Sequence, residues 1–377
     1  MGFGSSVEAS LANVSRRDFI KVCSAAAAAV GLPAWAAEKM AETVAKGHKP
    51  SVIWLHYQEC TGCTESLLRS SAPDVAALIL DLVSLDYHET LFAASGHQIE
   101  AALEQAMAEN KGRYVLVVEG AIPLKDDGIF CYVGGKKAVD TLKRVAADAA
   151  AVVAIGSCAS WGGIPSSFPN PTQAVGAPTV LQGSGKAIVT LPGCPANPYN
   201  LLGTVLQYAT FKTLPKLDEQ GRPLFAYGRV IHDDCPRRSH FDAGRFAQVF
   251  GDEGHRNGYC LYKLGCKGPQ THANCSLLDF CEVPGAWPVG IGHPCVGCTE
   301  QGILFGGDTK VETPIYTNLP IDKPTAPFAY PGVGPAQGKI APAAAGVAGL
   351  VIGAVAGAAF VASKKLSKED GPDEGGK

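Results

Sequence analysis

The sequence is poor in charge. Lys, Arg, Asp and Glu make up 18% of its 377 residues, below the usual ~25%, and the formal net charge is only −3. So small a net charge gives the chain no strong electrostatic bias toward nucleic acid or anionic lipid. Hydrophobic residues reach 46%, which excludes a chain that is disordered throughout. A disulfide scaffold is also excluded, because such scaffolds are short and use even numbers of cysteines.

Cysteine, glycine and proline are plentiful by contrast. The 13 cysteines stand beside 44 glycines and 26 prolines, the residue types that shape tight turns and stiff, irregular loops. Thirteen thiols in a large, loop-rich protein therefore indicate bound metal first.

Residues 1–36 have the order of an export signal. The twin arginines Arg16 and Arg17 precede a modest apolar stretch, Val22–Leu32, and Ala34–Ala36 offers an A-x-A cleavage site. A twin-arginine signal accompanies proteins that are exported already folded, which suits a protein that takes up its cofactor before crossing the membrane. The alternative is a basic amphipathic helix at the N-terminus.

The other end of the chain predicts a membrane anchor. A Pro-rich linker over 324–342 leads to a transmembrane helix over 343–363. This helix lies in an uncharged stretch, Ile340–Ala362, that is long enough to cross a ~30 Å hydrocarbon core. Lysines in the tail 364–377 favour a cytoplasmic C-terminus, and the export signal independently places the body outside. The alternative is a Gly/Ala-rich linker.

Between these ends the chain divides into two parts, 37–215 and 216–323. The first part alternates apolar runs with helical patterns, which predicts an α/β fold with a flavodoxin-like, doubly wound parallel sheet. The expected strands are Ser51–Leu55, Tyr114–Val118, Ala151–Ile155 and Ala187–Leu191. The expected helices are Gln98–Glu109 and Lys136–Ala150. In such sheets ligands bind beyond the carboxyl ends of the strands.

Four cysteines fall at those carboxyl ends. Cys60 and Cys63 follow the first expected strand, Cys158 follows the third and Cys194 the fourth. Three loops on one edge of the sheet should therefore bring four thiols together. Four thiolates suit zinc or an iron–sulfur cluster, and the spacing leaves both open.

The second part has little regular apolar pattern and many more candidate ligands. Because an irregular segment of this kind buries little core, metal sites are expected to stabilise it. Spacing by itself leaves a non-catalytic, multi-zinc binding module open. The candidate ligands are His232, Cys235, Cys260, Cys266, Cys275, Cys295 and Cys298.

Seven motifs, taken together and in this order, resemble the small subunit of nickel–iron hydrogenases across essentially the whole chain. The type resembled is the membrane-bound uptake enzyme exported by a twin-arginine signal. The motifs are Glu59–Glu65, Gly156–Gly163, Pro192–Pro195, His232–His240, Gly251–Arg256, Leu264–Pro269 and Gly292–Cys298.

The resemblance implies an irregular C-terminal domain that binds iron–sulfur clusters, with three clusters in a row. The proximal 4Fe-4S cluster would be held by Cys60, Cys63, Cys158 and Cys194. The medial 3Fe-4S cluster would be held by Cys275, Cys295 and Cys298. The distal 4Fe-4S cluster would be held by His232, Cys235, Cys260 and Cys266. Cys23, Cys131 and Cys281 are left over, and a ligand role for Cys281 stays open.

The resemblance also implies an activity. Hydrogen is cleaved at a nickel–iron centre in a partner large subunit, with which this chain would form a heterodimer. Electrons would leave through the three clusters to a membrane haem or iron–sulfur protein linked to quinone. The complex would be attached to the inner membrane on its periplasmic side. The runner-up is the iron–sulfur subunit of a membrane quinone oxidoreductase, which has a related fold.

For each of two pairs of charged residues, two interpretations stay open. Glu65, with Glu59, would relay protons beside the proximal cluster or hydrogen-bond loop amides. Arg237 and Arg238 would guide a redox partner or stay solvated.

Two glycines bear on the oxygen tolerance that the resemblance implies. Oxygen-tolerant relatives carry two additional cysteines around the proximal cluster, at positions that Gly62 and Gly163 occupy here. The resemblance therefore implies an ordinary proximal 4Fe-4S cluster and an oxygen-sensitive enzyme.

Overall fold

The computed structural model describes residues 24, 34–45, 49–70, 83–278, 280 and 283–304. Most of the expected export signal lies outside these residues, as do the expected linker, transmembrane helix and tail, and Cys281. Within the described ranges no helix has the length and hydrophobicity needed to cross a membrane. The transmembrane helix therefore stays a prediction.

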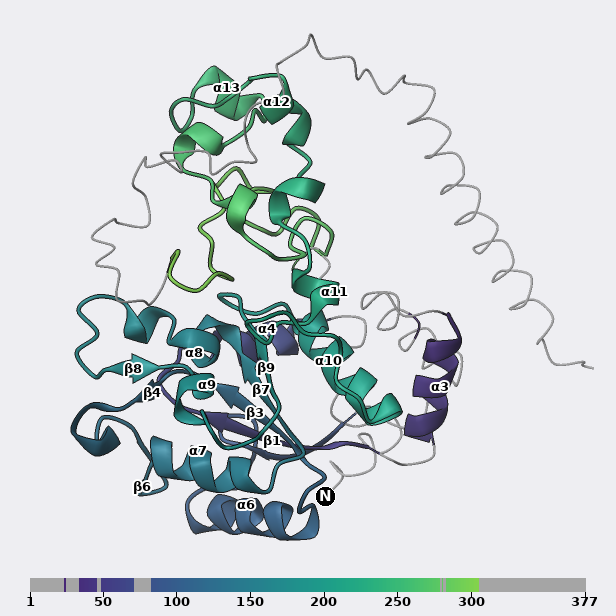
Figure 1. Ribbon diagram of the computed structural model, residues 1–377, viewed down its shortest axis with the longest axis vertical. Helices are drawn as coiled ribbons and strands as arrows, with labels where there is room; N and C mark the ends of the chain where they lie inside the picture. The colour runs from purple at the N-terminus through teal and green to yellow at the C-terminus, as the bar shows by residue number, and fades with distance from the viewer. Residues whose placement is uncertain are drawn as a thin grey trace, which may run out of the picture. The chain divides into compact units, whose positions relative to one another are not determined.

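The first part of the chain is built on a five-stranded parallel sheet (Figure 1). Its strands run in the order β2-β1-β3-β7-β9, and each neighbouring pair is parallel. This is the flavodoxin-like order, so the predicted fold class is confirmed for this part. The strands are β1 (Ser51–His56), β2 (Ser84–His88), β3 (Val115–Glu119), β7 (Ala151–Ile155) and β9 (Ile188–Leu191).

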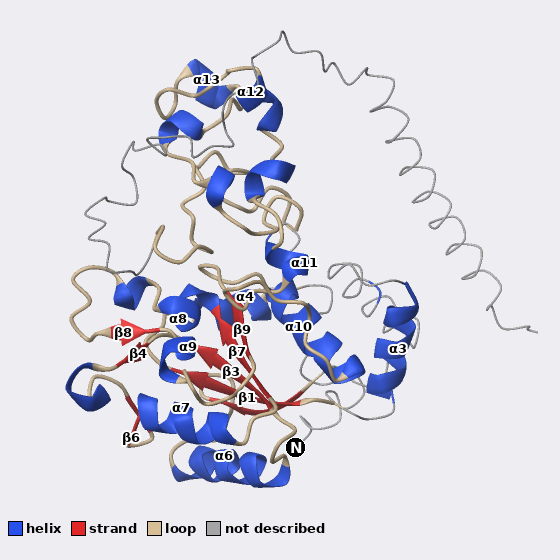
Figure 2. Ribbon diagram, viewed as in Figure 1, coloured by secondary structure: helices blue, strands red, loops and turns tan. Residues whose placement is uncertain are grey.

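Helices cover both faces of the sheet, as a doubly wound fold requires (Figure 2). One face packs on α6 (His97–Glu109) and α7 (Ala138–Ala147), with Ile53 and Leu55 in the core between them. The other face packs on α4 (Gly62–Leu68) and α10 (Pro198–Phe211), with Val52 and Trp54 in that core. Successive strand residues thus alternate between two cores, which is why β1, β3 and β7 are buried along their whole length.

The structure corrects two details of the expected elements. It adds the edge strand β2, whose first three residues are half-buried. This strand was not predicted because its sequence contains no continuous apolar run. The helix expected over Lys136–Ala150 is shorter, because Lys136–Lys137 is strand β6 in a hairpin with β5 (Tyr132–Val133). The turn residues Gly134 and Gly135 have φ of +56° and +76°, values that favour glycine in a tight hairpin.

Short elements surround the carboxyl ends of the strands. These elements are β4 (Ile122–Pro123), η2 (Lys125–Gly128), α8 (Gly156–Trp161), η3 (Ile164–Ser166), β8 (Ala174–Val175) and α9 (Ala177–Val180). Strands β4 and β8 pair with each other in an antiparallel direction.

Helix α3 (Ala34–Ala45) packs against α10. Ala36 and Met40 are fully buried, and the Trp35 ring meets the Phe211 ring edge-on at 5.8 Å. The expected cleavage site Ala34–Ala36 forms the first turn of this helix. Cleavage there stays a prediction.

From residue 224 to 304 the described chain has only short helices and isolated bridges, and Figure 2 shows mostly loops there. The apolar core that holds α10 continues into this part through Ile231, Leu264 and Trp287. The irregular second part expected from the sequence is therefore observed. Its elements are α11 (Leu224–Tyr227), η4 (Ile231–Asp234), α12 (Arg238–Asp242), α13 (Glu253–Arg256), η5 (Tyr262–Leu264) and η6 (Gly268–Gln270).

Candidate metal centres

The four cysteines of the first part gather at the carboxyl edge of the sheet. Cys60 and Cys63 follow β1, Cys158 lies in α8 directly after β7, and Cys194 follows β9. Their sulfurs are close enough to act on one another: Cys158 and Cys194 raise the pKa of the Cys63 thiol, and Cys60 raises that of Cys194, each after the larger effect of burial. The structure thus brings the expected proximal group together, with Cys60 and Cys194 exposed and Cys63 buried.

Glycines leave room for these sulfurs. A Cβ atom on Gly156 would lie 2.5 Å from Cys63 Sγ, and one on Gly163 would lie 2.6 Å from Cys158 Sγ. Both residues have positive φ, +79° and +52°, which favours glycine independently. A Cβ on Gly62 would lie 3.1 Å from Cys60 Sγ. The backbone is therefore shaped to hold sulfur at this edge and leaves little space for anything larger than hydrogen at these glycines.

Glu119 fixes the loop that carries Cys63. Its buried carboxylate ends β3 and accepts four hydrogen bonds: from Cys63 N (3.0 Å), Thr64 N (3.3 Å), Thr64 Oγ1 (2.6 Å) and Trp54 Nε1 (3.1 Å). Sequence reasoning missed this residue. The available signal was a charged residue closing the buried run Val115–Val118 at the edge where ligands bind.

A second polar group lies behind the proximal cysteines. Ligand atoms of His56, Glu59 and Glu119 all lie within 4.8 Å of one another, and His56 Nε2 is 3.4 Å from His88 Nε2. Since the Glu119 oxygens already accept four hydrogen bonds, we interpret this group as a hydrogen-bonded shell and not as a further metal site.

Burial shifts two titratable groups of this shell. It lowers the pKa of His88 to about 3, with a smaller contribution from the neighbouring His56. It raises the pKa of Glu89 to about 7, against the opposing hydrogen bond that the His56 backbone N–H donates to the carboxylate. His88 is therefore neutral near pH 7, whereas Glu89 titrates there.

The two glutamates expected beside the proximal cysteines differ in their surroundings. Glu59 is half-buried, accepts a hydrogen bond from Thr61 Oγ1 (3.2 Å) and lies 3.4 Å from His56 Nδ1. These contacts favour the hydrogen-bonding interpretation of Glu59. Glu65 is exposed on α4, and its proton-relay role stays a prediction.

The expected medial group also meets in space. Burial and then the Cys275 thiol raise the pKa of the Cys298 thiol, and burial, Cys266 of the distal group and Cys298, in that order, raise the pKa of Cys295. Cys295 is buried, whereas Cys275 and Cys298 are half-buried.

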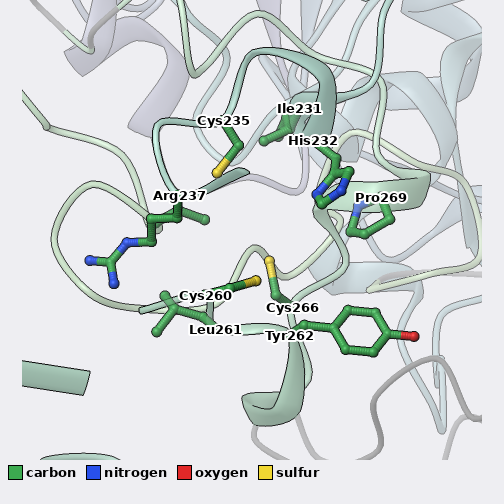
Figure 3. A pocket seen from close by; sticks show the side chains of 11 residues that line it. Ile231, His232, Cys235, Arg237, Cys260, Leu261, Tyr262, Cys266 and Pro269 are labelled. Carbon is green, nitrogen blue, oxygen red and sulfur yellow. The ribbon is translucent and has the colours of Figure 1, made fainter. Parts of the chain in front are cut away.

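The expected distal group lines a small cavity. Figure 3 shows the sulfurs of Cys235, Cys260 and Cys266 and the ring of His232 facing a common space. His232 is 5% exposed, and its ring meets the Phe241 ring edge-on at 4.5 Å. In the same view the Arg237 guanidinium points away from this space, and its Nη1 donates to the Tyr259 carbonyl at 2.9 Å.

Hydrogen bonds join the three groups in a row. The hydroxyl of Ser157, next to Cys158 of the proximal group, donates to the carbonyl of Cys298, in the medial group, at 2.5 Å. The N–H of Cys295, in the medial group, donates to Cys266 Sγ in the distal group at 3.4 Å. The medial group therefore contacts both of the others.

The comparisons with known proteins agree with this arrangement. Residues 60–208 match the family of the NADH ubiquinone oxidoreductase 20 Kd subunit, and residues 227–309 match the C-terminal region of the NiFe/NiFeSe hydrogenase small subunit. The chain is 57% identical over 292 residues to the Hydrogenase-2 small chain of Escherichia coli (strain K12), covering 78% of each chain. The chain belongs to the nickel–iron hydrogenase small subunits.

Two further comparisons cover a similar share of this chain. The quinone-reactive Ni/Fe-hydrogenase small chain of Wolinella succinogenes is 48% identical over 289 residues, 76% of this chain and 80% of the relative. The solved structure of the H2-activated Dm. baculatum [NiFeSe]-hydrogenase is 32% identical with a TM-score of 0.64, covering 71% of this chain and 99% of that chain.

Family membership decides between the interpretations left open by the sequence. Hydrogenase small subunits carry iron–sulfur clusters and pair with a large subunit that holds the nickel–iron site. The match to the quinone oxidoreductase subunit covers the α/β part only, whereas the hydrogenase relatives cover both parts. We therefore set aside both the quinone oxidoreductase and the zinc module.

The donor atoms of this small subunit fit iron–sulfur clusters. Burial and neighbouring sulfurs raise the pKa of Cys158, Cys260 and Cys298 to about 12, so that crowded thiols would remain protonated without a metal. Positive iron ions reverse this preference and stabilise the thiolates. Ten sulfurs and one imidazole in three buried or glycine-lined groups are thus chemically suited to clusters.

The remaining sequence candidates have ordinary surroundings. The Arg238 guanidinium lies over the Phe241 ring, 6.0 Å from its centroid. Cys131 is half-buried, packs against the core beneath α6 and α7, and has a pKa raised by burial. This agrees with a small hydrophobic side chain and not with a reactive thiolate.

Proposed function

We propose that this chain is the electron-transfer subunit of a membrane-anchored, periplasm-facing uptake hydrogenase. The proximal 4Fe-4S cluster is assigned to Cys60, Cys63, Cys158 and Cys194. The medial 3Fe-4S cluster is assigned to Cys275, Cys295 and Cys298. The distal 4Fe-4S cluster is assigned to His232, Cys235, Cys260 and Cys266. When bound, these clusters carry single electrons from the nickel–iron site of the large subunit towards a membrane acceptor.

The contiguity of the three groups carries this proposal. Ser157, next to Cys158, hydrogen-bonds to the Cys298 carbonyl, and the Cys295 N–H hydrogen-bonds to Cys266 Sγ. An electron relay needs its centres in a row at close spacing, whereas independent structural metal sites do not. These two contacts support the order proximal, medial, distal.

The exposure of the ligands supports a direction for the relay. Cys60 and Cys194 are exposed, whereas Cys63, Cys260, Cys266 and Cys295 are buried. We assign the open edge of the proximal group to the interface with the large subunit. At the other end of the row, the neutral imidazole of His232 replaces a thiolate, which leaves the distal group with one negative charge fewer and favours the electron there.

Membrane attachment rests on the two chain ends. The twin arginines indicate export, and the uncharged stretch Ile340–Ala362 provides an anchor with a cytoplasmic tail. The name of the Wolinella succinogenes relative describes that protein as quinone-reactive. We propose by analogy that a quinone-linked haem or iron–sulfur protein accepts the electrons here.

Oxygen sensitivity follows from the proximal glycines. Gly62 and Gly163 occupy the positions at which oxygen-tolerant relatives carry cysteine, and a Cβ atom at either would lie 3.1 Å or less from a ligand sulfur. We therefore propose an unmodified proximal 4Fe-4S cluster. Sustained hydrogen oxidation in air, or a two-step oxidation of this cluster, would contradict the proposal.

The test is purification of the intact membrane complex with the large subunit. Iron and sulfide analysis and spin-resonance spectra should show two four-iron clusters and one three-iron cluster, and mass spectrometry should identify the acceptor. Removal of residues 343–377 should release an active heterodimer from the membrane. A colourless chain containing zinc and no sulfide would overturn the relay.

A further inference from the structure

A buried arginine lies between the proximal and medial groups. Arg222 is 5% exposed and belongs to the loop after α10. That loop packs on the edge strand β9, since Thr190 N donates to the Gly221 carbonyl at 2.9 Å and Thr190 Oγ1 donates to the Gln220 carbonyl at 2.8 Å. The backbone of Arg222 is thus attached to the strand that leads into Cys194.

The guanidinium is held in one orientation by its own turn. Asp218 Oδ2 accepts from Arg222 Nε at 2.7 Å, and Asp218 Oδ1 accepts from the backbone N–H groups of Arg222 (2.8 Å) and Gln220 (2.9 Å). A side chain fixed in this way loses little further entropy when it makes its remaining contacts. These remaining contacts reach the medial group.

Arg222 Nη1 contacts the chain immediately after Cys298. It donates to Glu300 Oε1 at 2.9 Å and to the Thr299 carbonyl at 3.2 Å. Glu300 is 8% exposed and also accepts from His272 N (2.6 Å), while His272 Nδ1 lies 2.9 Å from the same oxygen. Thr299 Oγ1 donates to the His272 carbonyl at 2.9 Å. One carboxylate oxygen therefore joins the segments that carry Cys275 and Cys298.

The same arginine is connected to the proximal loop. Its guanidinium carbon lies 5.8 Å from the centroid of the Tyr227 ring. The Tyr227 hydroxyl donates to the Pro192 carbonyl at 2.7 Å, two residues before Cys194. Arg222 thus touches, directly or through one side chain, the backbone beside ligands of both groups.

We infer that Arg222 is a positioning residue that fixes the medial ligands relative to the proximal ligands, and that the Arg222–Glu300 pair sets the electrostatic potential at the medial site. This inference rests on the proposed function. The physical reason is that both charges are buried, where screening by water is weak. Arg222 also hydrogen-bonds the Thr299 carbonyl next to Cys298, and Glu300 accepts from the backbone N–H of His272. A cation near a cluster favours its reduced form, and an anion disfavours it.

The test is a set of substitutions in the intact heterodimer, read by redox titration of the three-iron spin-resonance signal. Arg222→Met should lower the midpoint potential of the medial cluster, and Glu300→Gln should raise it. The double variant should lie between the two single variants. Arg222→Lys keeps the charge and should restore most of the wild-type potential. A residue that is only structural would lose cluster content without these opposite shifts.

Arg144→Met is the matched control. Arg144 also pairs with a glutamate, Glu104 at 2.8 Å, but on the face of the sheet covered by α6 and α7, so its removal should leave the medial potential unchanged. If Arg222→Met fails to incorporate iron, Glu300→Gln, which has nearly the same shape, still carries the test.

The outcomes separate this inference from the proposed function. A wild-type complex without iron and sulfide overturns both. A wild-type complex with all three clusters, combined with medial potentials in Arg222→Met and Glu300→Gln equal to that of Arg144→Met, overturns the inference alone. Opposite shifts in the two variants support it.

Discussion

The proximal group and the medial and distal groups hold the same kind of ligand in different ways. The proximal cysteines lie in loops and short helices at the carboxyl edge of a sheet whose three central strands are buried along their length, and two of the four cysteines are exposed. The medial and distal cysteines lie among described helices of at most five residues; three of the six are buried and three are half-buried. The first site is placed by a sheet covered on both faces, whereas the described part of the second region has no sheet of its own and shares the apolar core that holds α10.

This difference shows two ways to build a metal site. A parallel sheet delivers loops to one edge whether or not metal is present, so the proximal site can stay open to a partner. An irregular chain has few backbone ladders to hold it, so bound metal contributes much of its folding free energy. Four predictions test this comparison.

The largest effect should follow removal of the clusters. Chelation of iron from the oxidised heterodimer should accelerate amide hydrogen exchange over residues 231–300 by about 100-fold, equivalent to about 2.7 kcal/mol. Strands β3 and β7 should keep their protection because their core contains no metal. Equal loss in both regions, measured by exchange mass spectrometry, would refute the comparison.

The next effect concerns the glycines that leave room for the proximal cysteine sulfurs. Gly156→Ala places a Cβ atom 2.5 Å from Cys63 Sγ and should abolish the proximal cluster signal while the medial and distal signals remain. Gly183→Ala is the matched control, because Gly183 has a similar φ of +78° and nothing within 4 Å of its Cβ position. Both variants share a backbone cost of about 1 to 2 kcal/mol. Equal cluster contents in the two variants would show that only backbone strain matters.

A smaller effect is expected for the carboxylate that holds the Cys63 loop. Glu119→Gln replaces an acceptor of four hydrogen bonds by an amide that repels some of the donors, which should destabilise the protein by about 3 kcal/mol. Glu104→Gln weakens two solvent-accessible ion pairs, with Arg144 and Lys136, and should cost about 0 to 1 kcal/mol. Chemical denaturation measures both. Similar values would mean that Glu119 does not fix the proximal loop.

The smallest effect is a pH dependence confined to the sheet region. Burial raises the pKa of Glu89 to about 7 in the folded protein, so the folded state binds this proton more tightly than the unfolded state. The contribution of Glu89 to stability is therefore fully present below about pH 4.5 and is lost progressively as pH rises through about 7. The difference between wild type and Glu89→Gln should show this slope. A difference that is constant with pH would refute the shift.

Much of the fold could be predicted because its signals are local. The buried runs of β1, β3, β7 and β9 are continuous and apolar, and each expected strand is found within one residue. The edge strand β2 escaped prediction because Ser84, Asp86 and His88 interrupt its apolar pattern. The hairpin ahead of α7 was missed because Lys136 and Lys137 fit a helix equally well, and only the two glycines before them mark a turn.

The sequence by itself determined the kind of site. Cysteine spacing after strands predicted a four-thiol group, and the motif order predicted a hydrogenase small subunit. These features depend on residue identity and neighbours along the chain, which the sequence states directly.

Only the tertiary structure decided which groups touch. The contacts of Ser157 with Cys298, of Glu119 with Cys63, and of Arg222 with Glu300 join residues 56 to 141 positions apart. No periodicity or motif encodes such pairs, because they arise where separate loops pack against one another. The row of three sites is therefore a property of packing, although each ligand can be found in the sequence.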